Sequence, residues 1–221
     1  MKKLITFVLL SALAVTADAG RKREKSGVVN GNTFTDSRYG FQLTSDGNWG
    51  IKTTDGEAPF RVIFVQKKFE VPSEYQATPD YTKVPRIVMY VDTTTVGPYA
   101  FVDSLVSQTY KSLQKSAILK EFELLAEQEL TARARQPFTV GSDKGVRWDG
   151  RAPYRKEVQL DNSGTAAKLV RSAYLGSIVA VKHGNLMLVF HVMSEEAFFQ
   201  TVMPEAVKII SSLKWLETPP K

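Results

Sequence analysis

The sequence predicts an α+β protein: an α/β/α sandwich with a central antiparallel sheet and helices on both faces. Segments 178–181 and 186–190 are apolar at nearly every position and flank a turn at Gly184. A sheet with one wet face would instead alternate apolar and polar residues, so both faces are expected to be covered. Residues 98–113 and 202–213 repeat apolar side chains every three or four positions, which is typical of helices that cover a sheet.

The amino-terminal segment has the pattern of a signal peptide. Two lysines precede an apolar run from Leu4 to Val15, and the small residues Ala17 and Ala19 fit the subsites of a signal peptidase. The run is shorter than the roughly 20 residues that a membrane-spanning helix needs. We therefore expect segment 1–19 to be removed and the protein to be exported, periplasmic or secreted, with no membrane span.

The rest of the chain is expected to form one domain. Residues 20–32 are basic, contain glycine and lack periodicity, so they are predicted to be a mobile leader. The domain is predicted to cover 33–216, followed by a tail at 217–221. The chain contains no cysteine, which excludes thiol nucleophiles, thiolate metal sites and a lipidated cysteine.

Short runs rich in β-branched and aromatic residues are predicted as strands in the first half of the domain. These runs lie around Phe34 and at 39–43, 49–51, 60–66 and 86–91. The polar segment 69–83 contains two prolines and has no helical period. It is therefore predicted to be a long loop.

A helix is predicted from Pro98, because proline at the first helical position loses no hydrogen bond. Segment 121–130 alternates glutamates with mostly apolar residues, which favours a strand with an acidic outer face, whereas its residue types favour a helix. We predict a strand there. A second helix is predicted to be capped by Ser194 and interrupted by Pro204.

Between these helices, short strands separated by turns are predicted. The strands are placed at 145–148, 154–160 and 169–176, and the turns at 149–150 and 162–164.

The pattern resembles the PsbP-like family. The resemblance rests on Tyr39–Leu43 followed by a turn and Trp49, on the apolar hairpin around Gly184, and on the closing segment Ile209–Trp215. The turn before Trp49 lacks the proline that such sequences usually carry. The resemblance implies an exported or lumenal α/β/α domain, a fold that also occurs in a Ran-binding import factor. It further implies a non-enzymatic role as an assembly factor, accessory subunit or binding module.

Basic residues gather in two stretches of a chain whose formal net charge is +6. One stretch is in the leader, and the other, 133–156, holds seven basic residues against two aspartates. Nucleic acid is a poor partner for an exported protein, so we expect an acidic protein or an anionic envelope component to bind. The candidate partner-binding residues are Arg147, Arg151, Tyr154, Arg155, Arg21, Lys22 and Arg23.

No nucleophile elbow, phosphate-binding glycine loop or dinucleotide fingerprint occurs in the chain. His183 and His191, placed on one hairpin arm, would be separated by about 26 Å, which is too far for a shared metal ion. His183 is predicted in a turn and His191 in the core. We therefore expect no cofactor and no enzyme activity.

Two other functions stay open on the sequence. The first is a carboxylate-based hydrolase, metal-dependent or a glycosidase, which would use residues such as Asp149 and Glu157. The second is a small-ligand carrier, which would need an apolar cavity between sheet and helix.

Overall fold

A computed structural model describes residues 24–54, 60–69, 84–106, 135–159 and 167–216, with only the backbone described at 152–159 and 167–172. The predicted strand at 121–130 and most of the predicted loop at 69–83 lie outside these ranges. Within the described residues, no helix is both long enough and apolar enough to cross a membrane.

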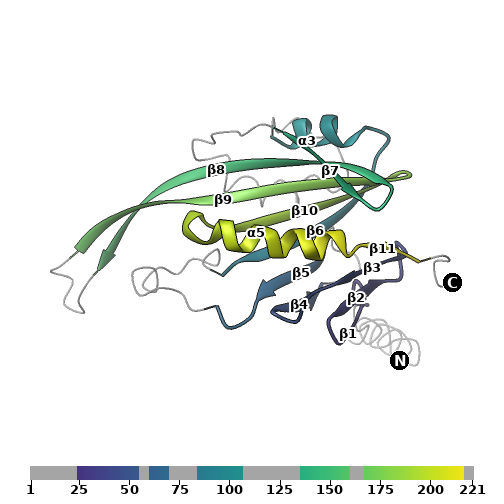
Figure 1. The fold of residues 1–221 in the computed structure, drawn as a ribbon, viewed down its shortest axis with the longest axis horizontal. Helices are drawn as coiled ribbons and strands as arrows, with labels where there is room; N and C mark the ends of the chain where they lie inside the picture. The colour runs from purple at the N-terminus through teal and green to yellow at the C-terminus, as the bar shows by residue number, and fades with distance from the viewer. Residues whose placement is uncertain (1–23, 55–59, 70–83, 107–134, 160–166, 217–221) are drawn as a thin grey trace, which may run out of the picture.

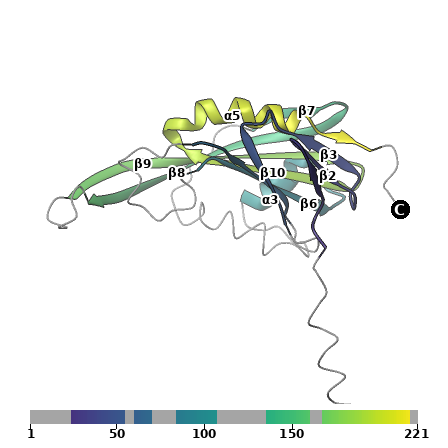
Figure 2. The same ribbon diagram turned by 90° about the horizontal axis from the view of Figure 1, so that it is seen from below.

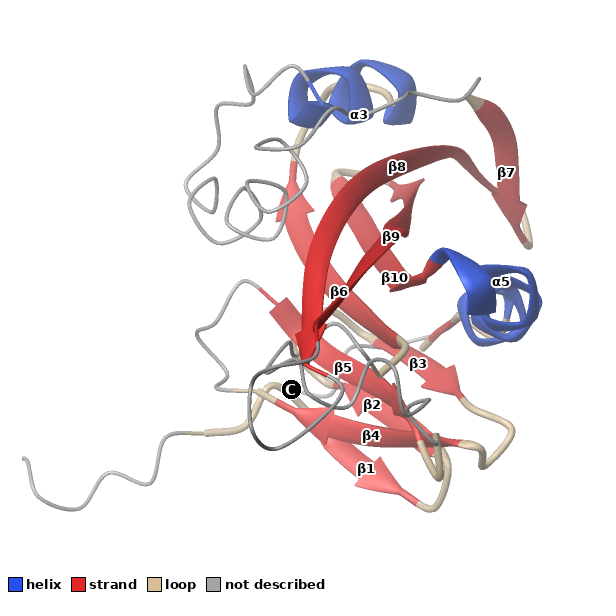
Figure 3. Cartoon of the chain, turned by 90° about the vertical axis from the view of Figure 1, so that its left-hand side faces the viewer, coloured by secondary structure: helices blue, strands red, loops and turns tan. Residues whose placement is uncertain are grey.

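The larger of two antiparallel sheets has seven strands in the order β4-β5-β6-β10-β9-β8-β7. It forms a curved layer across the molecule (Figures 1 and 3). Its strands are β4 (Trp49–Thr53), β5 (Phe60–Gln66), β6 (Arg86–Thr93), β7 (Gln136–Val140), β8 (Asp143–Gln159), β9 (Ala167–His183) and β10 (Leu186–Glu195).

The smaller sheet has the strand order β1-β2-β3-β11. It joins the two ends of the described chain, because β11 pairs Trp215 with Phe41 of β3. Its strands are β1 (Val28–Asn30), β2 (Thr33–Asp36), β3 (Phe41–Thr44) and β11 (Lys214–Trp215).

The β9–β10 hairpin is covered on both faces, as the sequence predicts. Side chains from 173 to 181 and from 187 to 195 are all buried. Met187 packs in a cluster with helix α3 (Pro98–Val106), whereas the next residue, Leu188, packs with helix α5 (Glu196–Ser211). Figure 2 shows the two helices on opposite sides of the large sheet.

The predicted fold class, an α/β/α sandwich, is nevertheless wrong. The described residues form two antiparallel sheets of four and seven strands and only two helices, of 9 and 16 residues. The predicted strands around Phe34 and at 39–43 do not belong to a central sheet but form a separate sheet with β1 and β11. Its buried residues Phe34, Phe41 and Leu43 share the α5 cluster, so a second sheet and not a helix layer alone covers that face.

The second half of the chain contains two long strands where short ones were predicted. β8 and β9 each run for 17 residues, and Gly150 lies opposite Gly176 instead of in a turn. A Cβ atom at Gly150 would lie 2.5 Å from the Trp148 ring. This glycine therefore marks close packing on the sheet, not a reversal of the chain.

The closing helix also differs in detail from its prediction. Its N-cap is Glu195, with no side-chain capping bond, and the Ser194 hydroxyl donates to the carbonyl oxygen of Glu195. Pro204 lies inside one continuous helix. Tertiary packing of the buried α5 face therefore outweighs the helix-breaking preference of this proline.

The described part of the predicted leader belongs to the fold. Ser26 is buried, and β1 pairs with β2 from Val28 opposite Thr35 to Asn30 opposite Thr33. Ser26 and β1 therefore pack with the domain that is predicted from residue 33 onward. A three-residue strand is too short to show periodicity, and only its long-range pairing reveals it.

Candidate functional site

Arg147 is the first of the predicted partner-binding residues, and an aspartate on its own strand engages it. Its Nε and a terminal nitrogen donate to the two carboxylate oxygens of Asp149 at 2.8 and 2.9 Å. The two residues are two positions apart on β8 and therefore share one face of the sheet. Val146 and Trp148, on the other face, are buried in the α3 cluster.

Arg151 connects β8 to the beginning of α5. Its guanidinium donates to both carboxylate oxygens of Glu196 at 2.9 and 2.8 Å. The hydrogen bond to Glu196 raises the pKa of Arg151, so this side chain stays cationic. A paired arginine contributes less net charge toward a partner than the sequence alone suggests.

Beyond Arg151, β8 and β9 continue as a two-stranded arm. β10 last pairs with β9 at Tyr174, whereas β8 and β9 pair from Pro153 opposite Ala173 to Gln159 opposite Ala167. We name residues 153–159 and 167–173 the basic arm. Seven residues on each strand extend about 23 Å, and the arm projects past the start of α5 (Figures 1 and 2).

Basic residues outnumber acidic residues in this arm. It holds four basic residues, Arg155, Lys156, Lys168 and Arg171, against Glu157. Arg155 lies directly opposite Arg171 in the register. Like charges in such a pair destabilise a ribbon, and an anion placed against them removes the penalty. The pairing of Arg155 with Arg171 cannot be foreseen from the sequence, because the two are 16 residues apart and their register depends on the whole hairpin.

The other candidates are only partly placed by the structure. Tyr154 and Arg155 lie in the arm with backbone described, and Arg21, Lys22 and Arg23 lie outside the described residues. Of the carboxylates named for a hydrolase, Asp149 is engaged by Arg147 and the side chain of Glu157 is not described. In the described part of the chain, no three His, Asp or Glu side chains gather as a metal site.

A cluster that sequence reasoning missed lies at the opposite end of β9. His183 Nδ1 is 2.9 Å from Asp143 Oδ1, and the Trp215 indole nitrogen donates to Asp143 Oδ2 at 2.7 Å. The His183 and Trp215 rings stack with centroids 3.9 Å apart. We name these three residues the Asp143 clamp. The clamp joins β11 of the small sheet to the start of β8 and the end of β9 in the large sheet.

Replacing Asp143 by alanine is expected to lower the free energy of unfolding by about 1–3 kcal/mol, because both the indole and the imidazole lose their partner. Asp103→Ala is the matched control, since Asp103 pairs with Arg135 at an exposed position and such pairs contribute under about 1 kcal/mol. Urea unfolding followed by tryptophan fluorescence measures both. Equal losses of unfolding free energy in the two variants would show that the Asp143 clamp does not stabilise the fold.

The sequence has no match among family models or curated proteins. Solved structures are similar to the chain. The cyanobacterial PsbP (CyanoP) of Synechocystis sp. PCC 6803 has 10% identity and a TM-score of 0.44, over 89% of this chain and 99% of that one. The Ran-binding protein Mog1p of Saccharomyces cerevisiae has 7% identity and a TM-score of 0.42, over 86% and 97%.

A third similar structure is LpqN, involved in cell envelope biogenesis of Mycobacterium tuberculosis. It has 14% identity and a TM-score of 0.43, over 86% of this chain and 90% of that one. The chain is thus similar to solved structures of a PsbP and of a Ran-binding protein, the two kinds of protein that the resemblance in the sequence names. At these identities and TM-scores, no residue role, ligand or partner of these proteins transfers to the chain.

Proposed function

We propose that this protein is an exported, non-catalytic binding module of the cell envelope that docks an acidic protein surface through its basic arm. The observation that carries the proposal is the pairing of Arg155 with Arg171 on an arm with four basic residues and one acidic residue. Export rests on the signal-peptide pattern of segment 1–19.

The arm has features of a docking element. A two-stranded ribbon is marginally stable alone, and this one extends beyond the sheet that supports its base. Arg155 and Arg151 share a face of β8 because they are four residues apart. The Arg151–Glu196 pair ties the base of the arm to α5 and limits how far the arm can swing. Tyr154, next to Arg155 in the sequence and therefore on the other face of the arm, is an aromatic residue of the kind enriched at interfaces.

Arg147 and Arg151 have a different role in this proposal from Arg155 and Arg171. Arg151 connects the base of the arm to α5 through its ion pair with Glu196, whereas Arg147 is paired with Asp149 on its own strand. Arg21, Lys22 and Arg23 add positive charge that steers an acidic partner during approach. Contact itself is assigned to Arg155 and Arg171, which share one face of the arm.

The proposal predicts salt-sensitive binding to an acidic probe. A fluorescein-labelled polyglutamate peptide is expected to bind the protein at about 50 mM salt and to weaken at least about tenfold at about 500 mM, because salt screens exposed charges. The double variant Arg155→Glu and Arg171→Glu is expected to remove this binding. Fluorescence anisotropy measures the dissociation constant.

A charge-matched control distinguishes the effect of the arm residues on binding from the effect of the protein's net charge. Lys208→Glu with Lys214→Glu makes the same charge change at two exposed positions on α5 and β11, away from the arm. It is expected to keep most of the binding. Equal weakening in both double variants, or binding that is insensitive to salt, would overturn the docking model. Binding to anionic lipid vesicles but not to polyglutamate would assign the arm to a membrane surface instead.

The partner itself can be captured in intact cells. A photo-crosslinking amino acid in place of Tyr154, followed by mass spectrometry, is expected to capture a protein with an acidic surface. The same adduct should disappear when Arg155 and Arg171 are both changed to glutamate. An adduct that persists in that background would show that the contact does not depend on the two arginines and would contradict the proposal.

A further inference from the structure

One face of β8 carries arginines both at the base of the basic arm and within it. Arg151 and Arg155 are four residues apart on the strand, so they lie on the same face. Arg171 is opposite Arg155 in the register of β9 and shares that face. The three arginines therefore lie in one row, which begins at the base of the arm and continues along it.

Arg151 already holds a carboxylate in the structure. Its Nε and a terminal nitrogen donate to the two oxygens of Glu196 at 2.9 and 2.8 Å. This two-point geometry is the one in which arginine recognises carboxylates with both strength and specificity. Glu196 is the first residue of α5, 45 positions further along the chain. Its carboxylate therefore occupies the position that an Asp or Glu of a docked partner would take.

The Arg151–Glu196 pair can exchange partners at low cost. Both side chains are accessible, Arg151 being 36% and Glu196 39% exposed, and exposed ion pairs contribute little to stability. The buried pair of Asp36 with Arg61, in contrast, is closed to a partner. Glu196 also lies in the first turn of α5, where the helix N-terminus favours a negative charge. It therefore keeps a favourable environment when Arg151 leaves it.

We propose that Glu196 is an internal competitor of the acidic partner. It occupies Arg151 in the free protein, and a partner carboxylate displaces it on docking, so that Arg151 joins Arg155 and Arg171 in the contact. This inference rests on the proposed function of the basic arm and adds the regulation of that site. Arg151 and Arg155 are separated by about 13 Å along an extended strand, so the fitting partner carries carboxylates spread over at least this distance.

Replacing Glu196 by glutamine tests the competition, because it removes the internal carboxylate and leaves Arg151 in place. The fluorescein-labelled polyglutamate peptide is expected to bind Glu196→Gln about two- to fivefold more tightly than the wild-type protein, since it no longer displaces a charged group. Asp103→Asn is the matched control, because it makes the same charge change in an exposed pair, with Arg135, on the other side of the large sheet (Figure 2). It is expected to leave the affinity unchanged. Fluorescence anisotropy measures both variants.

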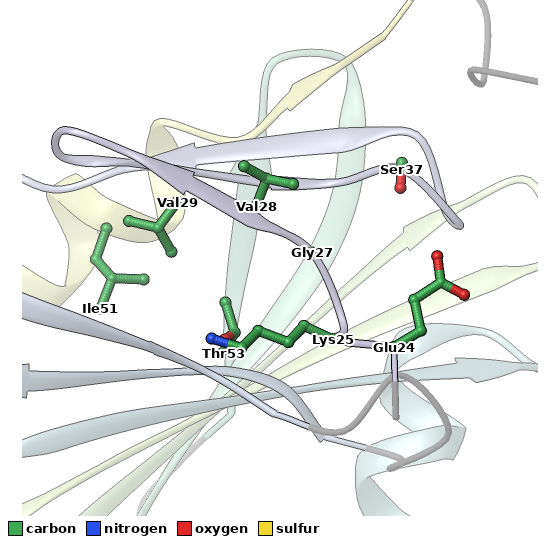
Figure 4. A pocket seen from close by; sticks show the side chains of 8 residues that line it. All are labelled: Glu24, Lys25, Gly27, Val28, Val29, Ser37, Ile51 and Thr53. Atoms are coloured by element: carbon green, nitrogen blue, oxygen red, sulfur yellow. The ribbon is translucent and has the colours of Figure 1, made fainter. Parts of the chain in front are cut away.

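A second control addresses another place where the peptide could bind. Figure 4 shows an open groove between β1 and β4, whose charged lining residues are Glu24 and Lys25. The groove lies away from the basic arm (Figure 1). Glu24→Gln removes one carboxylate there and is expected to leave the affinity for the peptide unchanged. A gain equal to that of Glu196→Gln would show that the effect does not depend on Arg151 and would overturn the proposal.

Two further measurements connect the gain in affinity to Arg151 itself. In a protein that also carries Arg151→Gln, Glu196→Gln is expected to give no larger gain than Asp103→Asn gives. In NMR spectra, the Nε–H signal of Arg151 is expected to shift when the peptide is added. The corresponding signal of Arg147, which is bonded to Asp149, is expected to stay in place.

The outcomes distinguish failure of the competition from failure of the docking function. Equal affinities of Glu196→Gln and Asp103→Asn, a gain that persists without Arg151, or an Arg151 signal that does not move would overturn the competition and leave the docking of the arm in place. Wild-type protein that does not bind the peptide, or that binds it equally well after Arg155 and Arg171 are changed to glutamate, would overturn the docking function and the competition together.

Discussion

Replacing Asp36 by alanine is expected to lower the free energy of unfolding by about 3–5 kcal/mol, because the change leaves a buried guanidinium without its carboxylate. Asp36 is fully buried, and the Arg61 side chain is 3% exposed. The Asp36 carboxylate also accepts the amides of Arg38 and Tyr39 at 2.9 and 3.1 Å, so the turn into β3 loses its support as well. Urea or thermal unfolding measures the loss.

Asp46→Ala is the control for this prediction. Asp46 also accepts a backbone amide two residues on, that of Asn48 at 3.0 Å, but it is exposed and pairs with no buried cation. We expect it to cost less than about 1 kcal/mol, as exposed substitutions usually do. A second variant, Asp36→Leu with Arg61→Met, removes both charges and is expected to recover part of the loss. If Asp36→Ala were no more destabilising than Asp46→Ala, the buried pair would not stabilise the fold.

The second large effect concerns two neighbours in the central hairpin. Met187→Ala and Leu188→Ala are each expected to lower the free energy of unfolding by about 2–5 kcal/mol, because both side chains are fully buried. Met187 packs in the α3 cluster and Leu188 in the α5 cluster. A sheet with one wet face would make one of the two substitutions nearly neutral.

Denaturant unfolding of the two variants tests this directly. Val28→Ala serves as the control, since Val28 is a strand residue of similar type whose side chain is exposed. Its expected cost is under about 1 kcal/mol. A near-neutral result for either Met187→Ala or Leu188→Ala would show that one face of the hairpin is not part of a packed core.

The contact proposed for the basic arm depends on charge, so its binding should depend strongly on salt.

Local pattern predicted several elements well. Segment 60–66 is a strand at the predicted bounds, and the strand predicted at 86–91 runs from Arg86 to Thr93. Pro98 begins a helix, and Phe101, Val102 and Leu105 form its buried face. These predictions succeed because hydrophobic periodicity and the backbone preferences of proline act over a few neighbouring residues.

Predictions failed where the outcome depends on distant pairing. Asp149-Gly150 reads as a turn, but the strand continues because Gly150 pairs with Gly176 and leaves room for Trp148. The pair Val28-Val29 reads as part of a flexible leader, yet it forms an edge strand through β2. In both cases, contacts between residues far apart in the sequence outweigh the local turn or coil preference.

The candidate site also combines features that the sequence predicts with features that depend on pairing between distant residues. Sequence reasoning identified Arg147 and Arg151 as a basic surface, but their carboxylate partners Asp149 and Glu196 reduce the charge that they present. The Asp143 clamp was missed because its members come from three elements. The adjacent pairing of Lys144 with Lys182 is what places Asp143 near His183, and that register is not encoded in either segment alone.

The sequence by itself determined the two-sided burial of the central hairpin, the helix that begins at Pro98 and the surplus of basic residues, because each follows from the type and spacing of neighbouring residues. Only the tertiary structure decided that the opening strands form their own sheet and that Arg155 lies opposite Arg171 in the register. The physical reason is that strand pairing joins residues far apart in the chain. Its register is selected by the packing of whole sheets, and no local pattern contains that information.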